Sequence, residues 1–142
     1  MPEVGFYVLT TDSLAERYQF ACKLIEKAYR SGVFPYVLTD NPEQSRQIDD
    51  LLWTFRAGSF IPHQLFTGDM SAEQNVILIG SDQPPEGWQK TVINLSSHCP
   101  QTYQQAERIL EILDSSEDCK AAGRSRYRQY QQAEIDITTH KI

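Results

Sequence analysis

VGFYVLTTDS, residues 4–13, is the stretch that decides the fold class of this 142-residue chain. Residues 4–10 are rich in β-branched and aromatic side chains, which favour a strand, and Thr11-Asp-Ser13 supplies side chains that can cap a helix. From Leu14 to Tyr29, apolar residues recur at three- and four-residue steps, the spacing of a helix with one apolar face. The chain therefore begins with a strand that leads into a helix.

The same order repeats further along the chain. Residues 33–39 predict a second strand, and Asp40-Asn-Pro42 introduces a second helix over residues 44–53. Two later segments, residues 75–79 and 91–95, are short continuous apolar runs of the kind found in buried central strands. This pattern predicts an α/β fold with a mostly parallel sheet and helices on both of its faces.

The C-terminal third is less regular. Residues 103–107 have helical spacing, and residues 108–113 are compatible with either a continued helix or a fifth strand. We favour a short helix that runs into a strand, followed by a final exposed helix over residues 117–133 and a frayed tail. No repeat, low-complexity segment or linker divides residues 1–142, so we expect one three-layer α/β domain.

Composition and charge exclude several classes of protein. The net charge of −6 disfavours direct binding of nucleic acid, whose affinity comes largely from basic side chains on phosphates. Cys22, Cys99 and Cys119 are odd in number and form no Cys-x-x-Cys pair, which favours a reducing compartment over a disulfide framework or a zinc site. No signal peptide and no apolar run of roughly 18 residues is present. We expect a cytoplasmic protein that does not bind membranes.

The first strand-to-helix turn carries no nucleotide-binding motif. It reads Leu9-Thr-Thr-Asp-Ser13, which contains no glycine, and the carboxylate of Asp12 would repel a phosphate at the helix N-terminus. His63 and Asp69 are two possible metal ligands without a third. We therefore expect neither a nucleotide cofactor nor a metal.

His98 and Cys99 are the only neighbouring imidazole and thiol. A thiolate nucleophile needs a nearby base or cation, but adjacent residues on an extended chain point to opposite sides. A loop histidine beside a half-buried cysteine is the simpler interpretation. A small α/β enzyme that uses His98 and Cys99, or Asp12, is the alternative function.

The C-terminal helix carries a basic and aromatic stripe. Lys120, Arg124, Tyr127 and Gln131 follow at helical spacing, and residues 119–133 contain four basic residues and no acidic one. Such a surface suits an acidic peptide that ends in an aromatic residue and a carboxylate, although a solvated helix or a direct nucleic-acid contact is also compatible. Three residues lie off this stripe and are expected to serve packing or solubility: Arg126, Arg128 and Tyr130.

A second segment, residues 51–66, is unusually aromatic for a turn. Leu52 and Trp53 fit the last inward turn of the second helix. Phe60-Ile-Pro-His63 follows the loop signal Gly58-Ser59, and exposed aromatic residues are enriched at protein–protein hot spots. This segment is the second candidate binding surface.

Taken together, these segments resemble the chi subunits of bacterial DNA polymerase III, accessory proteins of the clamp-loader complex. The resemblance covers nearly the whole chain and rests on four blocks: Phe6-Tyr7, Leu51-Leu-Trp53, Ser59-Phe-Ile-Pro-His63 and Arg124-Ser-Arg-Tyr-Arg-Gln-Tyr130. It implies a single Rossmann-like domain without a bound nucleotide, and a non-catalytic adaptor that takes part in DNA replication.

The resemblance also implies two protein-binding surfaces. One binds the psi subunit of the clamp loader, or alternatively a helicase related to the iron–sulfur repair helicases. Its matching positions are Trp53, Phe60, Ile61, Pro62 and His63. The other binds the acidic C-terminal tail of the single-stranded-DNA-binding protein. Its matching positions are Lys120, Arg124, Tyr127 and, less securely, Leu113. One departure is Ala133-Glu134, where the family pattern has Ala-Gly, and it puts the outline of the tail pocket in question.

Overall fold

One parallel sheet forms the centre of the structure. The computed structural model describes residues 2–54, 60–66, 75–85, 87–100 and 103–142. The strands of this part of the chain are β1 (Glu3–Val8), β2 (Tyr36–Leu38), β3 (His63–Leu65), β4 (Ile77–Gly80), β5 (Thr91–Asn94), β6 (Arg108–Leu113) and β7 (Asp136–Lys141). They lie in the order β3-β4-β2-β5-β6-β1-β7, and each neighbouring pair is parallel.

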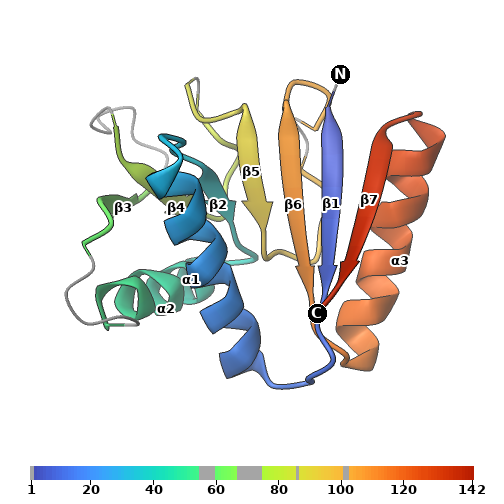
Figure 1. Cartoon of the computed structure of the whole chain (residues 1–142), viewed down its shortest axis with the longest axis horizontal. Helices are drawn as coiled ribbons and strands as arrows, with labels where there is room; N and C mark the ends of the chain where they lie inside the picture. The colour runs from blue at the N-terminus through green and yellow to red at the C-terminus, as the bar shows by residue number, and fades with distance from the viewer. Residues whose placement is uncertain (1, 55–59, 67–74, 86, 101–102) are drawn as a thin grey trace.

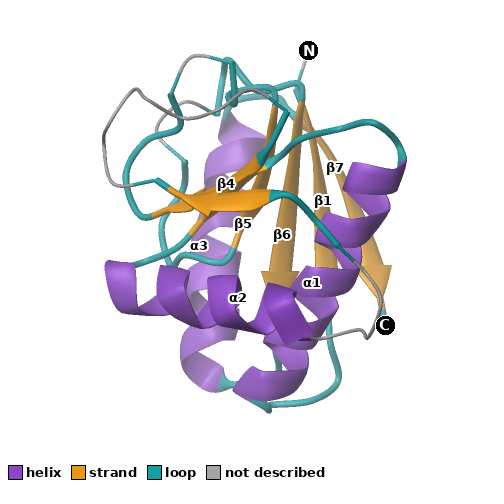
Figure 2. Ribbon diagram, turned by 90° about the vertical axis from the view of Figure 1, so that its left-hand side faces the viewer, coloured by secondary structure: helices purple, strands orange, loops and turns teal. Residues whose placement is uncertain are grey.

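Helices cover both faces of this sheet. They are α1 (Leu14–Arg30), α2 (Pro42–Thr54) and α3 (Glu117–Gln132). Figures 1 and 2 show α1 and α2 on one face and α3 on the other. Side chains alternate accordingly, since Ile77 and Ile79 pack towards α1 and α2 whereas Leu78 packs on the side of α3. The predicted α/β, Rossmann-like architecture with a parallel sheet is confirmed.

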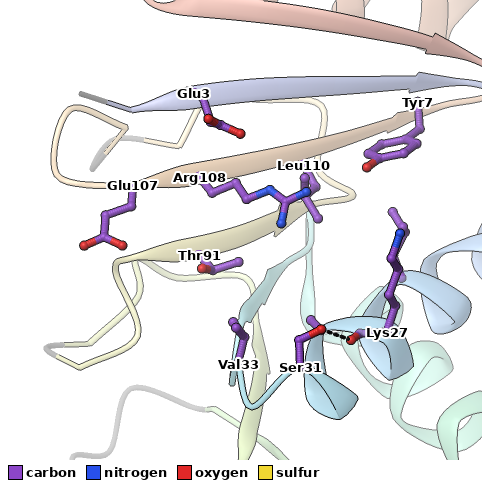
Figure 3. Close-up of a pocket in the computed structure, with 11 residues that line it drawn as sticks. Glu3, Tyr7, Lys27, Ser31, Val33, Thr91, Glu107, Arg108 and Leu110 are labelled. Carbon is purple, nitrogen blue, oxygen red and sulfur yellow. Dashed lines mark hydrogen bonds between the residues drawn. The ribbon is translucent and has the colours of Figure 1, made fainter.

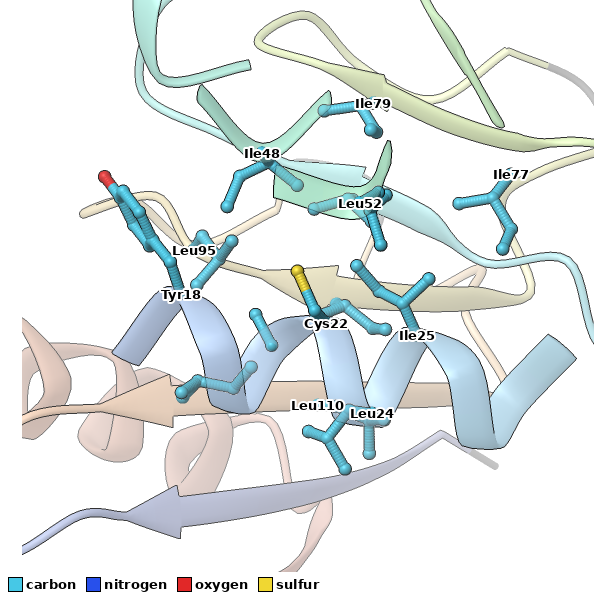
Figure 4. Packing of buried hydrophobic residues seen from close by; sticks show 14 of the residues in the cluster. Tyr18, Cys22, Leu24, Ile25, Ile48, Leu52, Ile77, Ile79, Leu95 and Leu110 are labelled. Carbon is cyan, nitrogen blue, oxygen red and sulfur yellow. The ribbon is translucent and has the colours of Figure 1, made fainter. Parts of the chain in front are cut away.

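The first core lies between the sheet and the helix pair α1 and α2 (Figure 4). There Cys22 and Ile25 of α1 meet Ile48 and Leu52 of α2, and each of these residues is at most 2% exposed. Full burial of a large apolar side chain favours folding by roughly 1.5–3 kcal/mol. Burial also raises the pKa of Cys22 to about 12, so its thiol stays protonated and packs as a small apolar group.

The second core, under α3, has a charged centre. Glu111 of β6 is fully buried, and its carboxylate accepts hydrogen bonds from Arg126 Nε (3.0 Å), Tyr130 Oη (2.7 Å) and Asn94 Nδ2 (3.0 Å). Burial raises the pKa of Glu111, while the Arg126 guanidinium and the three donors oppose this by favouring the charged form. Because Arg126 and Tyr130 lie one turn apart on α3, this network fixes the rotation of the helix on the sheet.

The region before β6 differs from the prediction. Residues 103–105 form turns instead of the expected helix, and residues 108–113 form the predicted strand. β6 pairs with β1 on one side and with β5 on the other, which buries its last five residues. Pairing on both edges therefore decided residues 108–113 in favour of the strand.

The expected frayed tail is instead strand β7. It pairs with β1 along its whole length, from Asp136 opposite Glu3 to Lys141 opposite Val8. Ile135 and Ile137 pack partly buried against the second core, which holds the strand to the sheet edge. The other side chains of β7 are polar and exposed, so the sequence contains little strand signal.

The final helix was expected to be exposed, and this is correct for one side only. Gly123, Arg126 and Tyr130 are buried on the side that faces the sheet. Of the helices in the described residues, none is long and apolar enough to cross a membrane.

Candidate functional site

A groove of about 240 Å³ lies between α3 and the strands β1, β6 and β7. We call it the α3 groove, and it is lined by Phe6, Val8, Leu113, Lys120, Gly123, Arg124, Tyr127 and Thr139. The four residues that the family resemblance implies for tail binding, Lys120, Arg124, Tyr127 and Leu113, are in this set, whereas Gln131 of the predicted stripe is not. The structure therefore brings the predicted stripe of α3 together with Leu113, which the sequence had placed on a different element.

The rim of the α3 groove is basic and its wall is aromatic. Lys120 and Arg124 are exposed one turn apart, and neither forms an ion pair with any acid in the described part of the chain. Tyr127 is half-buried, with its ring 5.5 Å from that of Phe6. Two free cations thus stand beside an apolar surface, an arrangement that can bind an anionic group joined to an apolar one.

The floor of the α3 groove depends on a close helix–strand contact. Leu113 is 7% exposed and lies directly under Gly123. A Cβ atom at position 123 would lie 2.5 Å from Leu113 Cδ1, so only glycine allows α3 to approach β6 this closely. Sequence reasoning did not assign Gly123, Phe6, Val8 or Thr139 to the site, because their shared position depends on the packing of three strands against α3.

The residues off the stripe have the roles predicted for them. Arg126 and Tyr130 are buried and hold Glu111, and Arg128 is exposed without lining the α3 groove. The rotation that points Arg126 and Tyr130 at the sheet is the same rotation that leaves Lys120 and Arg124 at the rim.

The departure at Ala133-Glu134 affects the end of the helix and not the α3 groove. Glu134 has a positive φ of 60°, its N–H bonds to Gln131 O (3.0 Å), and Ile135 N bonds to Tyr130 O (3.1 Å). This is a Schellman ending, in which glycine is the preferred residue at the left-handed position. Glu134 is exposed and does not line the α3 groove.

The second candidate surface is an exposed aromatic pair, Trp53 and Phe60, which we call the Trp53 patch. Trp53 is 56% exposed and Phe60 is 66% exposed, with their ring centroids 6.0 Å apart. The expected inward orientation is right for Leu52, which is 2% exposed, and wrong for Trp53. Two large apolar side chains are therefore displayed together at the end of α2.

The remaining predicted residues of this surface lie beneath the patch. Ile61 is 2% exposed and the His63 side chain is 1% exposed, while Pro62 is half-buried. His63 begins strand β3 instead of lying in a loop. Gly58 and Ser59, the loop signal in the sequence, and Asp69, the possible metal partner of His63, lie outside the described residues.

The two surfaces lie at opposite ends of the sheet. The Trp53 patch lies beside the edge strand β3, and the α3 groove lies over β6, β1 and the other edge strand, β7. Figure 1 shows α2 and β3 at one side of the molecule and α3 and β7 at the other. A partner on one surface therefore leaves the other open.

The crevice at the carboxyl ends of the strands, where nucleotides bind in related folds, is partly filled by a protein side chain. Arg17 is buried there, and it donates hydrogen bonds to Ile112 O through Nε (2.9 Å) and to Leu95 O through Nη2 (3.3 Å). A guanidinium thus occupies the ends of β5 and β6, next to the turn that lacks glycine.

His98 and Cys99 have different surroundings. The His98 imidazole is 82% exposed, with Nε2 4.0 Å from Asp40, whereas Cys99 packs partly buried against the second core. Burial raises the pKa of Cys99, which keeps the thiol protonated and weakens it as a nucleophile. In the described residues no three His, Cys, Asp or Glu side chains are grouped to hold a metal.

Another hollow, of about 350 Å³, lies at the amino ends of β1, β5 and β6 beside the end of α1 (Figure 3). Its four charged side chains, Glu3, Lys27, Glu107 and Arg108, are all exposed, and the hydrogen bond drawn there joins Ser31 Oγ to the Lys27 carbonyl (3.0 Å). Two of these charges are negative and two are positive, so the hollow does not favour a ligand of either charge.

Comparison with known proteins gives a consistent result over the full chain. The family model described as DNA polymerase III chi subunit, HolC, matches residues 1–138. The DNA polymerase III subunit chi of Pseudomonas aeruginosa is 30% identical over 142 residues, which cover 100% of this chain and 98% of that protein. The subunits of the same name from Haemophilus influenzae and Escherichia coli are 25% and 22% identical, over 96% and 98% of this chain and 95% and 97% of theirs.

Proposed function

The chain belongs to the DNA polymerase III chi subunit family, and from this premise we propose that it is a non-catalytic adaptor of the replicative polymerase. Membership makes it a subunit that serves DNA replication. In the proposed role, one cytoplasmic domain links the psi subunit of the clamp loader to the acidic C-terminal tail of the single-stranded-DNA-binding protein. A helicase related to the iron–sulfur repair helicases is the alternative partner at the psi-binding surface.

The α3 groove carries the proposal for the tail. Lys120 and Arg124 would receive the terminal carboxylate and aspartates of the tail through charge-assisted hydrogen bonds, and Tyr127 and Leu113 would pack against its apolar end. An overall charge of −6 keeps the rest of the surface unfavourable for an acidic peptide, so binding is confined to this groove. Arg124 is the expected anchor.

The test is a titration of each variant with a peptide of that tail at low salt. Losing one charge-assisted contact costs roughly 1.5–3 kcal/mol, so Arg124→Glu should weaken binding by about ten- to a hundred-and-fifty-fold or more. The matched control is Arg128→Glu, because Arg128 is exposed on the same helix but outside the α3 groove. If both variants bind the peptide as wild type does, or lose affinity equally, the assignment is wrong.

The Trp53 patch carries the proposal for psi or the helicase. Phe60→Ala should abolish co-purification with psi and leave tail binding unchanged, because the two surfaces lie at opposite ends of the sheet. Leu14→Ala is a suitable control, since Leu14 is also a large exposed apolar side chain but lies at the start of α1. A folded Phe60→Ala protein that still co-purifies would remove Phe60 from the interface.

Two further measurements separate this adaptor from the alternatives. Alkylation of Cys99 should be tolerated by an adaptor and should inactivate an enzyme that uses His98 and Cys99. Filter binding with naked single-stranded DNA, compared with DNA coated by its binding protein, distinguishes an adaptor from a direct nucleic-acid binder. The free energy changes of Arg124 and Phe60 variants should add when both are combined.

A further inference from the structure

The resemblance to the family places His63 among the partner contacts, and in the structure its imidazole lies beneath the Trp53 patch. The imidazole is 1% exposed while the residue as a whole is half-buried, so its backbone is more accessible than its side chain. The ring lies between the exposed end of α2 and β3, with its centroid 4.8 Å from that of Trp53. Trp53 in turn contacts Phe60 at 6.0 Å. The His63 side chain can therefore affect a partner through Trp53.

Two polar contacts fix the position of the imidazole. His63 Nδ1 lies 2.6 Å from Ile61 O, and a carbonyl oxygen only accepts, so Nδ1 carries a proton and donates to it. His63 Nε2 lies 3.1 Å from Asp49 Oδ1, at an angle outside that of a hydrogen bond. The ring is therefore held by the backbone just before β3 on one side and contacts an α2 carboxylate on the other.

We propose that His63 is a positioning residue, which contacts Asp49 and holds the Trp53 ring against Phe60. The inference rests on the proposed docking role of the Trp53 patch. Asp49 and Trp53 both belong to α2, while His63 begins β3, so the contact ties the edge strand to the helix. On its other side His63 pairs with Ile77 of β4, which is uncharged. Among the described residues, Asp49 is the acidic group within 4.0 Å of the imidazole.

The Trp53 ring packs on this imidazole. The two ring centroids are 4.8 Å apart and the ring planes are 56° apart, a tilted contact of the kind that aromatic pairs favour. Replacing the imidazole, or removing its contact with Asp49, would allow the Trp53 ring to adopt other rotamers. Occupancy of the docking conformation is therefore expected to depend on both contacts.

The first experiment compares the tryptophan emission of wild type and variants at one fixed pH. His63→Gln should shift the emission maximum to longer wavelength, because the Trp53 ring loses the imidazole beneath it, and Asp49→Asn should shift it in the same direction. In the Trp53→Phe background neither change should have an effect, although Trp88 remains. Asp50→Asn is the matched control, since Asp50 is the exposed neighbour on α2, and it should behave as wild type. If His63→Gln or Asp49→Asn leaves the emission unchanged, the proposal is overturned.

The second experiment measures the affinity for purified psi at the same pH. Asp49→Asn should weaken psi binding by about two- to tenfold, the equivalent of one aromatic contact, and Asp50→Asn should not. If Trp53→Ala abolishes binding while Asp49→Asn has no effect, the positioning role is wrong. If the emission results are as expected but Trp53→Ala binds psi normally, the docking role fails and the local role of His63 stands.

Discussion

The buried charge under α3 yields a prediction whose size follows from the structure. Glu111→Gln removes one negative charge without removing volume, so no cavity forms. The Arg126 side chain is 3% exposed and has Glu111 as its counter-ion 3.0 Å away. Leaving such a cation unpaired in the interior typically costs about 3–5 kcal/mol. Because domains are stable by only about 5–15 kcal/mol, this is a large share of the total.

Urea denaturation followed by circular dichroism at pH 7 measures this loss directly. We expect the free energy of unfolding of Glu111→Gln to fall by about 3–5 kcal/mol, with a lower midpoint and an unchanged slope. The double variant Glu111→Gln with Arg126→Met should recover much of the loss, because the unpaired cation is then absent. A loss below about 1 kcal/mol in the single variant, or no recovery in the double variant, would refute the reasoning that Arg126 depends on Glu111.

Two further predictions concern the same helix and its ends. Gly123→Ala gains about 1 kcal/mol of helix propensity, but its methyl group would press on Leu113, so urea denaturation should show a net loss that Leu113→Val partly restores. Glu134→Gly should raise stability by about 0.5–1 kcal/mol in a thermal scan, because the left-handed position no longer carries a side chain.

Much of the fold follows from local patterns in the sequence. The strand and helix of residues 4–29 and the buried runs at β4 and β5 have strong periodicity and β-branched or aliphatic content, so tertiary contacts only adjust their ends. β7 has no such signal, because a polar edge strand is defined by its partner β1 and by the anchoring of Ile135 and Ile137. Tertiary contacts also decided residues 108–113, whose pattern fitted either a helix or a strand, because this segment pairs with β1 on one side and β5 on the other.

The candidate sites could also be predicted from the sequence only in part. The spacing of Lys120, Arg124 and Tyr127 is a property of one helix, and the sequence alone determined that they share a face. Only the tertiary structure placed Leu113 under Gly123 as the floor of the α3 groove. This contact joins β6 to α3, and the two elements lie this close because Gly123 has no side chain.

At the other end of the sheet, the sequence indicated an aromatic surface but not which of its side chains are exposed. Trp53 and Phe60 are exposed, whereas Ile61 and the His63 side chain are buried. Burial depends on how β3 packs beside α2, which no local pattern records. The sequence therefore determined which residue types occur at each surface. The packing of the helices on the sheet decided which of these side chains are exposed to a partner and which are buried under the exposed ones.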